Sequence, residues 1–170
     1  MIHYIYDFNH RHRSFNLRPF GDLQMGEPGF RADLWKRWKS DMMHDTTALA
    51  IGLGDYSDRF RHTVDTKLRQ VLVTDDGSGV EFDDMIRREV QNLAVEFKPF
   101  AHRIIGLHTG HHRHTFMDGQ NSDSYLSQLL KVRYLDFCAA GTILWKRGKR
   151  GDSRAINIFS THGDGGSSAI

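Results

Sequence analysis

Short apolar runs alternate with amphipathic segments along this chain, and the alternation predicts an α/β fold. Apolar runs of five to seven residues that end in polar or glycine-containing turns are typical of strands. Such runs predict strands at 15–20, 47–53, 103–107, 134–139, 142–146 and 155–160. The run 47–53 is almost continuously apolar, as expected for a strand that is buried on both faces.

Apolar residues three or four positions apart predict the helices between these strands. These helices are expected at 30–44, 56–73, 83–97 and 122–131. Asp83 or Asp84 is expected to cap the third helix, after a polar loop at 74–79, and Pro99 is expected to end it. The helix that carries Trp35 and Trp38 is expected to face the core rather than to stack on bases.

The order of the elements predicts one domain over 1–170, whose sheet is parallel at first and antiparallel or mixed toward the C-terminus. A second sheet is an alternative. Residues 1–13 form either an extra strand or a polar tail in this interpretation. Pro19 lacks a backbone donor, so we expect it at the end of the first strand, or that strand to be shorter.

Composition narrows the classes of protein to which the chain can belong. Of 170 residues, 39% are hydrophobic and 26% are charged, which is typical of a globular domain. The net charge is only +2, and the basic run 146–150 is interpreted as a hairpin tip rather than a nucleic-acid patch. No apolar stretch approaches the roughly 18 residues of a membrane span. The first residues lack a signal-peptide pattern, so a cytoplasmic protein without a membrane partner is expected.

Polar clusters follow four of the predicted strands, and the chain contains eleven histidines. The clusters are Gly21-Asp22, Gly54-Asp55, Gly110-His111-His112 and His162-Gly163-Asp164. Ligands of open α/β sheets bind outside the carboxyl ends of the strands, so these side chains are expected at one rim. Carboxylate and imidazole groups together suit Mn, Fe, Zn or Ni. Alternatively, the aspartates only form turns and the histidines belong to solvated loops.

The order of these clusters resembles that of the calcineurin-like metallophosphoesterases. That family has the blocks D-x-H, G-D-x-x-D, G-N-H-D/E, H-G and G-H-x-H. The corresponding stretches here, over residues 15–166, are FGDLQMG, GLGDYSD, GLHTGHHRH and FSTHGDGG. The resemblance implies an α/β fold of the metallophosphoesterase αββα type, a sandwich with mixed sheets, and a phosphoesterase activity.

The resemblance also implies a role for individual residues. The implied ligands of two divalent metal ions are Asp22, Gln24, Asp55, His111 and His162. Asp55 would bridge the two ions. His112 matches the catalytic histidine that lies near the phosphate and protonates the leaving group. By contrast, His108 and His114 are expected to be neighbours of the ligands or surface groups.

The chain departs from the family pattern at several positions. Gln24 replaces a histidine, which weakens one ligand, His111 replaces an asparagine, and Arg113 replaces an acidic residue. No G-H-x-H block occurs in the eight residues after His162. The resemblance therefore implies a fold that is incomplete at the C-terminus and lacks two ligands.

These residues predict an enzyme that hydrolyses a phosphomonoester or phosphodiester through a dinuclear metal site and a metal-bound hydroxide. The substrate class includes nucleotides and nucleic acids. The alternative is a catalytically impaired metal-binding or scaffold protein of the same fold. A third interpretation is a site that an oligomer or a second polypeptide completes.

Overall fold

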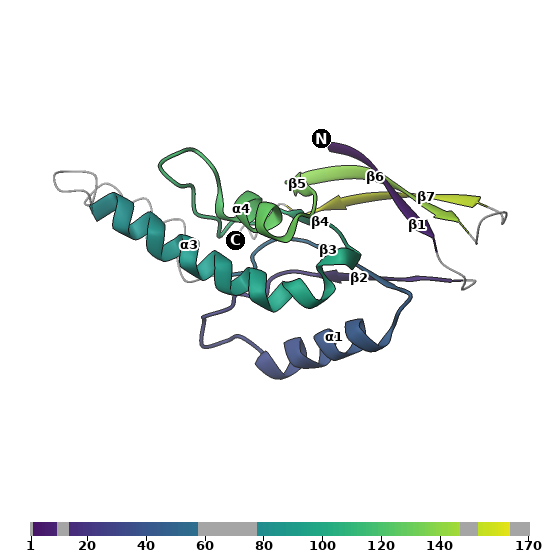
Figure 1. The fold of residues 1–170 in the computed structure, drawn as a ribbon, viewed down its shortest axis with the longest axis horizontal. Helices are drawn as coiled ribbons and strands as arrows, with labels where there is room; N and C mark the ends of the chain where they lie inside the picture. Colours follow the sequence, from purple (N-terminus) through teal and green to yellow (C-terminus); the bar gives the residue numbers. More distant parts are fainter. Residues whose placement is uncertain (1, 10–13, 58–77, 147–152, 164–170) are drawn as a thin grey trace, which may run out of the picture.

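A computed structural model describes residues 2–9, 14–57, 78–146 and 153–163 of the chain. These residues form an α/β fold with two sheets (Figure 1). The strands are β1 (Ile2–Asn9), β2 (Asn16–Phe20), β3 (Ala48–Gly52), β4 (Ile104–His108), β5 (Tyr134–Asp136), β6 (Cys138–Lys146) and β7 (Ser153–Thr161). The helices are α1 (Ala32–His44), α3 (Ser78–Phe97), α4 (Ser122–Leu130) and the 3-10 helix η1 (Lys98–Arg103).

The first sheet is parallel and has the strand order β2-β3-β4-β5. All five residues of β3 are buried, which confirms the interpretation of its continuous apolar run. Pro19 of β2 pairs with Ile51 of β3, and β2 lies at the edge of the sheet rather than in its centre. An edge strand tolerates proline because it lacks a neighbour on one side. Pro19 is the penultimate residue of β2, which begins at Asn16, one residue later than predicted.

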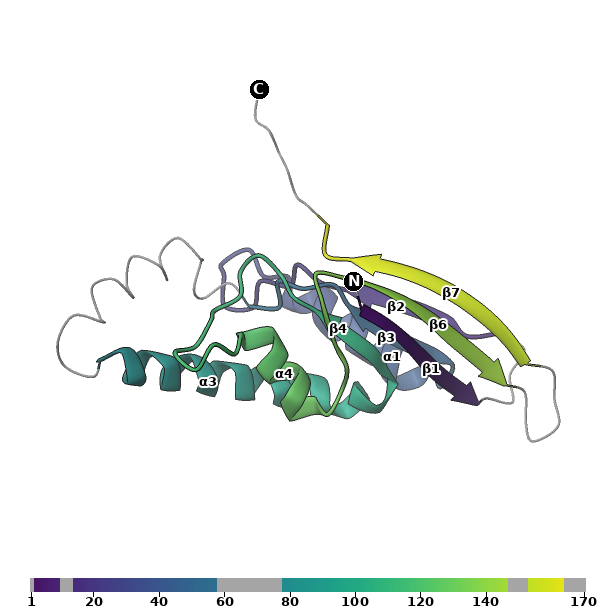
Figure 2. The ribbon, with the colours of Figure 1, turned by 90° about the horizontal axis from the view of Figure 1, so that it is seen from above.

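The second sheet has three strands in the order β1-β6-β7. Strand β1 runs parallel to β6, with Ile5 opposite Thr142, and β7 runs antiparallel to β6 (Figure 2). The parallel first part and the mixed C-terminal part are thus confirmed, and the alternative with a second sheet is the one observed rather than a single sheet. Of the two alternatives for the N-terminus, residues 2–9 form a strand.

Two apolar clusters define the layers. The first lies between the helices and the four-stranded sheet, where Trp35 and Met42 of α1 pack with Ala48 and Ala50 of β3. The second contains the alternate β3 residue Leu49 and side chains of the three-stranded sheet. Helices therefore cover one face of the central sheet, and the second sheet covers its other face (Figure 1).

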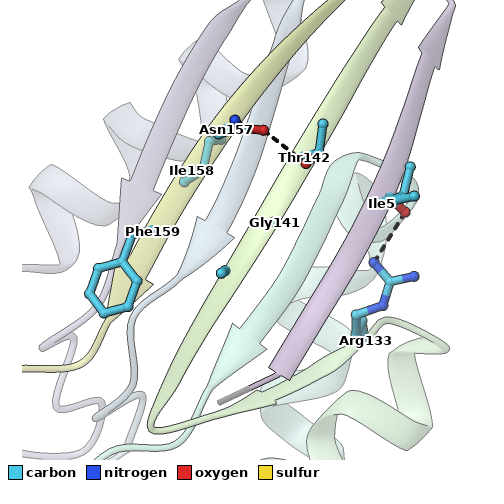
Figure 3. A pocket seen from close by; sticks show the side chains of 8 residues that line it. Ile5, Arg133, Gly141, Thr142, Asn157, Ile158 and Phe159 are labelled. Atoms are coloured by element: carbon cyan, nitrogen blue, oxygen red, sulfur yellow. Dashed lines mark hydrogen bonds between the residues drawn. The ribbon is translucent and has the colours of Figure 1, made fainter.

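The outer face of the three-stranded sheet carries an open hollow of about 900 Å³ (Figure 3). Ile5 and Phe159, which line it, are each 62% exposed. Arg133 at its edge donates a hydrogen bond to the carbonyl oxygen of Ile5. In the described ranges no helix covers this face, so the described residues form one helical layer and two sheet layers, and the αββα type stays a prediction.

The beginning of α3 differs from the prediction. Helix α3 begins at Ser78, so the prediction that Asp83 or Asp84 caps it is wrong, as is a loop at 78–79. Asp83 is buried within α3, and its carboxylate accepts hydrogen bonds from the backbone N–H of Met117 and from Nε2 of His114 instead of capping the helix. Most of the predicted helix at 56–73 and most of the basic tip at 146–150 lie outside the described residues. Among the helices that are described, none has the length and apolar character needed to cross a bilayer.

Candidate metal centre

Loops from three strand ends meet at one edge of the central sheet. The loop after β2 lies against the loop after β3, because the backbone N–H of Asp22 donates to the carbonyl oxygen of Gly54 at 3.0 Å. The N–H of Gln24 likewise donates to the carbonyl oxygen of Asp55 at 3.1 Å. The segment after β7 reaches the same edge, since His162 contacts Leu53. The strand-end positions inferred from the sequence thus come together.

Asp55 is at the centre of this edge and is only 5% exposed. Its backbone has a left-handed φ of 52°, which is uncommon for a residue other than glycine and is found often at functional sites. One carboxylate oxygen, Oδ1, accepts a hydrogen bond from the backbone N–H of His112 at 3.0 Å. The other, Oδ2, lies 3.3 Å from Nε2 of His162.

The protonation of His162 follows from its hydrogen bonds. Its Nδ1 lies 2.5 Å from the carbonyl oxygen of Leu53, which can only accept, so Nδ1 carries the proton. In the neutral ring, Nε2 then has a lone pair, and this atom lies 2.8 Å from Nδ1 of His111. One ligand atom from each of Asp55, His111 and His162 lies within 4.8 Å of the other two. Such close electron-rich atoms require a proton or a cation between them.

Two glycines make this approach sterically feasible. Gly54 has a φ of 100°, and a Cβ atom there would lie 2.7 Å from Nδ1 of His162. A Cβ atom on Gly110 would lie 1.9 Å from Oδ1 of Asp55. The glycines beside the polar clusters therefore serve for close approach as well as for turns.

The remaining predicted site residues lie around this group. His112 is 26% exposed on its side chain, and its Nε2 lies 3.9 Å from Oδ2 of Asp55. Asp22 is exposed and Gln24 is half-buried. Among the described residues, the group of converging His and carboxylate ligand atoms does not include Asp22, and both Asp22 and Gln24 line a neighbouring cavity. The group thus offers protein ligands for one ion, and the second ion stays a prediction.

Asp123 is a buried site residue that the sequence interpretation missed. It lies in the first turn of α4, and its Oδ2 accepts hydrogen bonds from the Thr109 hydroxyl at 3.0 Å and the Gly110 N–H at 2.9 Å. Burial raises the pKa of this carboxyl to about 6, against the opposing effect of those hydrogen bonds. Asp123 therefore anchors the backbone directly before His111. No signal in the sequence indicated this role, because an aspartate in the first turn of a helix, after a cap such as Asn121, is common.

Two further histidines, His108 and His114, are buried near these loops. His108 is fully buried, with Nδ1 2.8 Å from the Asp136 carbonyl oxygen and Nε2 2.8 Å from the Ser160 hydroxyl. Because the carbonyl accepts from Nδ1, Nε2 accepts from Ser160, and burial lowers the pKa of the ring. His108 thereby joins β4 to β7 two residues before His162. His114 is also buried, with Nε2 2.8 Å from Asp83.

Arg113, where the family pattern has an acidic residue, contacts its own loop. Its Nη1 donates to the Gly110 carbonyl oxygen at 3.0 Å, and its guanidinium lies 4.7 Å from the centre of the Phe137 ring. These contacts orient Arg113 toward the loop that carries His111 and His112.

No protein-family model, curated protein or solved structure matches this chain. The resemblance to the metallophosphoesterases therefore depends on the sequence motifs alone and stays a prediction.

Proposed function

We propose that this protein is a metal-dependent phosphoesterase, with Asp55, His111 and His162 as ligands of a divalent ion. The observation that carries the proposal is the convergence of one carboxylate oxygen and two imidazole nitrogens at the carboxyl edge of a parallel sheet. Ligands of α/β proteins bind at this edge.

The donor set fits an ion of the Mn, Fe, Zn or Ni type. These ions accept imidazole and carboxylate ligands together, whereas Mg and Ca prefer oxygen atoms alone. His162 also has the usual arrangement of a metal-bound histidine, with the other ring nitrogen donating to a backbone carbonyl, here Leu53. When bound, such an ion would polarise a phosphoryl oxygen and lower the pKa of water.

The protein's own residues supply positioning and a proton in this proposal. His112 is tied to Asp55 through its backbone N–H, and its partly exposed ring can donate a proton to the leaving oxygen of a phosphomonoester or phosphodiester. The second ion, for which the resemblance implies Asp22 and Gln24 as ligands, is not part of this proposal, because both residues line a separate cavity. The proposed fold is the αββα sandwich of the metallophosphoesterases.

The proposal is tested by metal content and turnover measured on the same samples. The protein is incubated with Mn²⁺, dialysed and analysed for bound metal, and hydrolysis of bis(p-nitrophenyl) phosphate is followed. We expect Asp55→Asn, which keeps an acceptor for the His112 N–H, to lose both metal and turnover. The matched control is His102→Ala, an exposed histidine before the opposite end of β4, which should retain both. Metal content unchanged in Asp55→Asn would refute the site.

A metal-binding or scaffold protein without hydrolytic activity is the second candidate. It is favoured by the position of Asp22 outside the converging group and by the contacts that turn Arg113 toward its own loop. This candidate predicts about one ion per chain, lost in Asp55→Asn, with no hydrolysis of the diester at any metal concentration. Light scattering with and without Mn²⁺ tests whether an oligomer completes the site.

A further inference from the structure

A cavity of about 400 Å³ lies beside the candidate metal centre, between the loop after β2 and helix α1. This volume falls in the usual range for small-molecule sites. Aromatic side chains, Phe30 and Trp38, line one part of it. Asp22 and Gln24, which the converging ligand group does not use, line another part. The cavity therefore combines flat apolar surface with hydrogen-bonding groups.

The aromatic part is held rigidly. Trp38 stacks on buried Trp35 with an interplanar angle of 12° and ring centres 5.2 Å apart. The Trp38 ring also packs 5.0 Å from the buried ring of Phe20. Trp38 itself is only partly buried, so it presents aromatic surface at a fixed position. A planar ring can stack there with little loss of side-chain entropy.

The polar part is fixed by the same loop contacts that build the metal centre. Asp22 and Gln24 have left-handed φ angles of 48° and 49°, and such angles persist in residues other than glycine only where the surroundings impose them. Here the imposing contacts are the hydrogen bonds from their backbone N–H groups to Gly54 and Asp55. The polar part of the cavity therefore lies on the loop next to the one that carries Asp55.

The charges at the cavity favour a neutral ring over a phosphate group. Arg31, which also lines the cavity, donates to both carboxylate oxygens of Asp33 at 2.9 and 2.7 Å. This pair largely cancels its own charge. The Asp22 carboxylate then repels an anion, whereas it accepts a hydrogen bond from an amino group.

We propose that this cavity binds the adenine base of the substrate, with the ring stacked on Trp38. The Gln24 amide has the donor and acceptor needed for a bidentate contact with N7 and N6 of adenine. The Asp22 carboxylate accepts a hydrogen bond from the second N–H of the N6 amino group. The inference rests on the proposed function for the position of the phosphate end, which would extend toward Asp55.

Isothermal titration calorimetry in EDTA tests the base site without metal or turnover. We expect adenosine to bind with a Kd of about 1 mM or tighter, and ribose not to bind. Inosine should bind at least roughly tenfold more weakly, because it presents an oxygen to Asp22 in place of the amino group. Titrations with AMP and with a deoxyadenosine tetranucleotide then show whether a nucleotide or a strand is preferred.

Two tryptophan variants test whether adenosine binds in this cavity. Leu34→Trp should fill the cavity from a position that is 52% exposed and should weaken adenosine binding at least roughly tenfold. Leu129→Trp, at a 38% exposed position on α4, is the matched control and should bind as the wild type does. Asp22→Asn should remove the discrimination between adenosine and inosine, because an amide can donate a hydrogen bond to the inosine oxygen whereas a carboxylate cannot. Absence of adenosine binding, or equal binding by Leu34→Trp, would overturn the inference. Binding without diester hydrolysis would instead refute only the proposed activity.

Discussion

Replacement of Asp123 by asparagine should change how the stability of the protein depends on pH. The side chain is buried at the start of α4, and its Oδ2 accepts hydrogen bonds from Thr109 and Gly110. Asparagine has nearly the same shape and keeps an acceptor oxygen for these donors, but it cannot ionise. The variant therefore isolates the effect of the negative charge.

The expected magnitude follows from the pKa. Burial raises the pKa of Asp123 from the ordinary 3.8 to about 6 in the folded protein. The folded state thus holds this proton more tightly than the unfolded state does, so stability is lost as the pH rises from about 4 to about 6. One pKa unit corresponds to 1.36 kcal/mol, so the loss amounts to about 3 kcal/mol. Asp123→Asn should avoid it.

Urea unfolding in EDTA, repeated at several pH values, measures this effect. The free energy of unfolding of Asp123→Asn minus that of the wild type should increase by about 3 kcal/mol between about pH 3.5 and pH 7.5. Asp118→Asn is the control, because hydrogen bonds lower the pKa of that exposed carboxyl and its difference should change in the opposite direction. A difference for Asp123→Asn that stays constant with pH would refute the reasoning.

Two further predictions concern backbone positions. Gly110→Ala should abolish Mn²⁺ retention, because its Cβ would lie 1.9 Å from Oδ1 of Asp55. Gly29→Ala, where a Cβ meets no atom within 4 Å, should retain Mn²⁺; equal retention by both variants would contradict the geometry. Lys131→Gly should raise the free energy of unfolding by about 1 kcal/mol in urea titrations, because Lys131 ends α4 with a left-handed φ of 56°. Lys131→Ala keeps the Cβ, so an equal gain there would exclude this explanation.

Regular local patterns allowed most of the fold to be predicted. The apolar run 47–53 became the fully buried β3, and the four-residue spacing before Pro99 became α3, which ends at Phe97. The beginning of α3 was predicted wrongly. Asp83 is of a residue type that often caps helices, but its carboxylate accepts hydrogen bonds from the distant residues His114 and Met117. No local pattern reveals such a contact.

For the site, the sequence could predict only which loops follow the strand ends. Glycine next to aspartate or histidine after an apolar run indicated which loops reach the carboxyl edge of the sheet. The sequence could not indicate that His162 comes within 3.3 Å of Asp55 while Asp22 lines a different cavity. That outcome depends on side-chain direction and on hydrogen bonds between loops, such as the one from His162 to Leu53.

The amino-acid sequence by itself determined the α/β class, most strand and helix positions and the set of loops that carry ionisable groups. These properties follow from periodicity and turn composition, which are local. Tertiary structure decided which of those groups meet, which glycines are sterically required and which acid, Asp123, is buried beneath the loop. The physical reason is that burial and convergence depend on contacts between residues far apart in the chain, which local spacing does not specify.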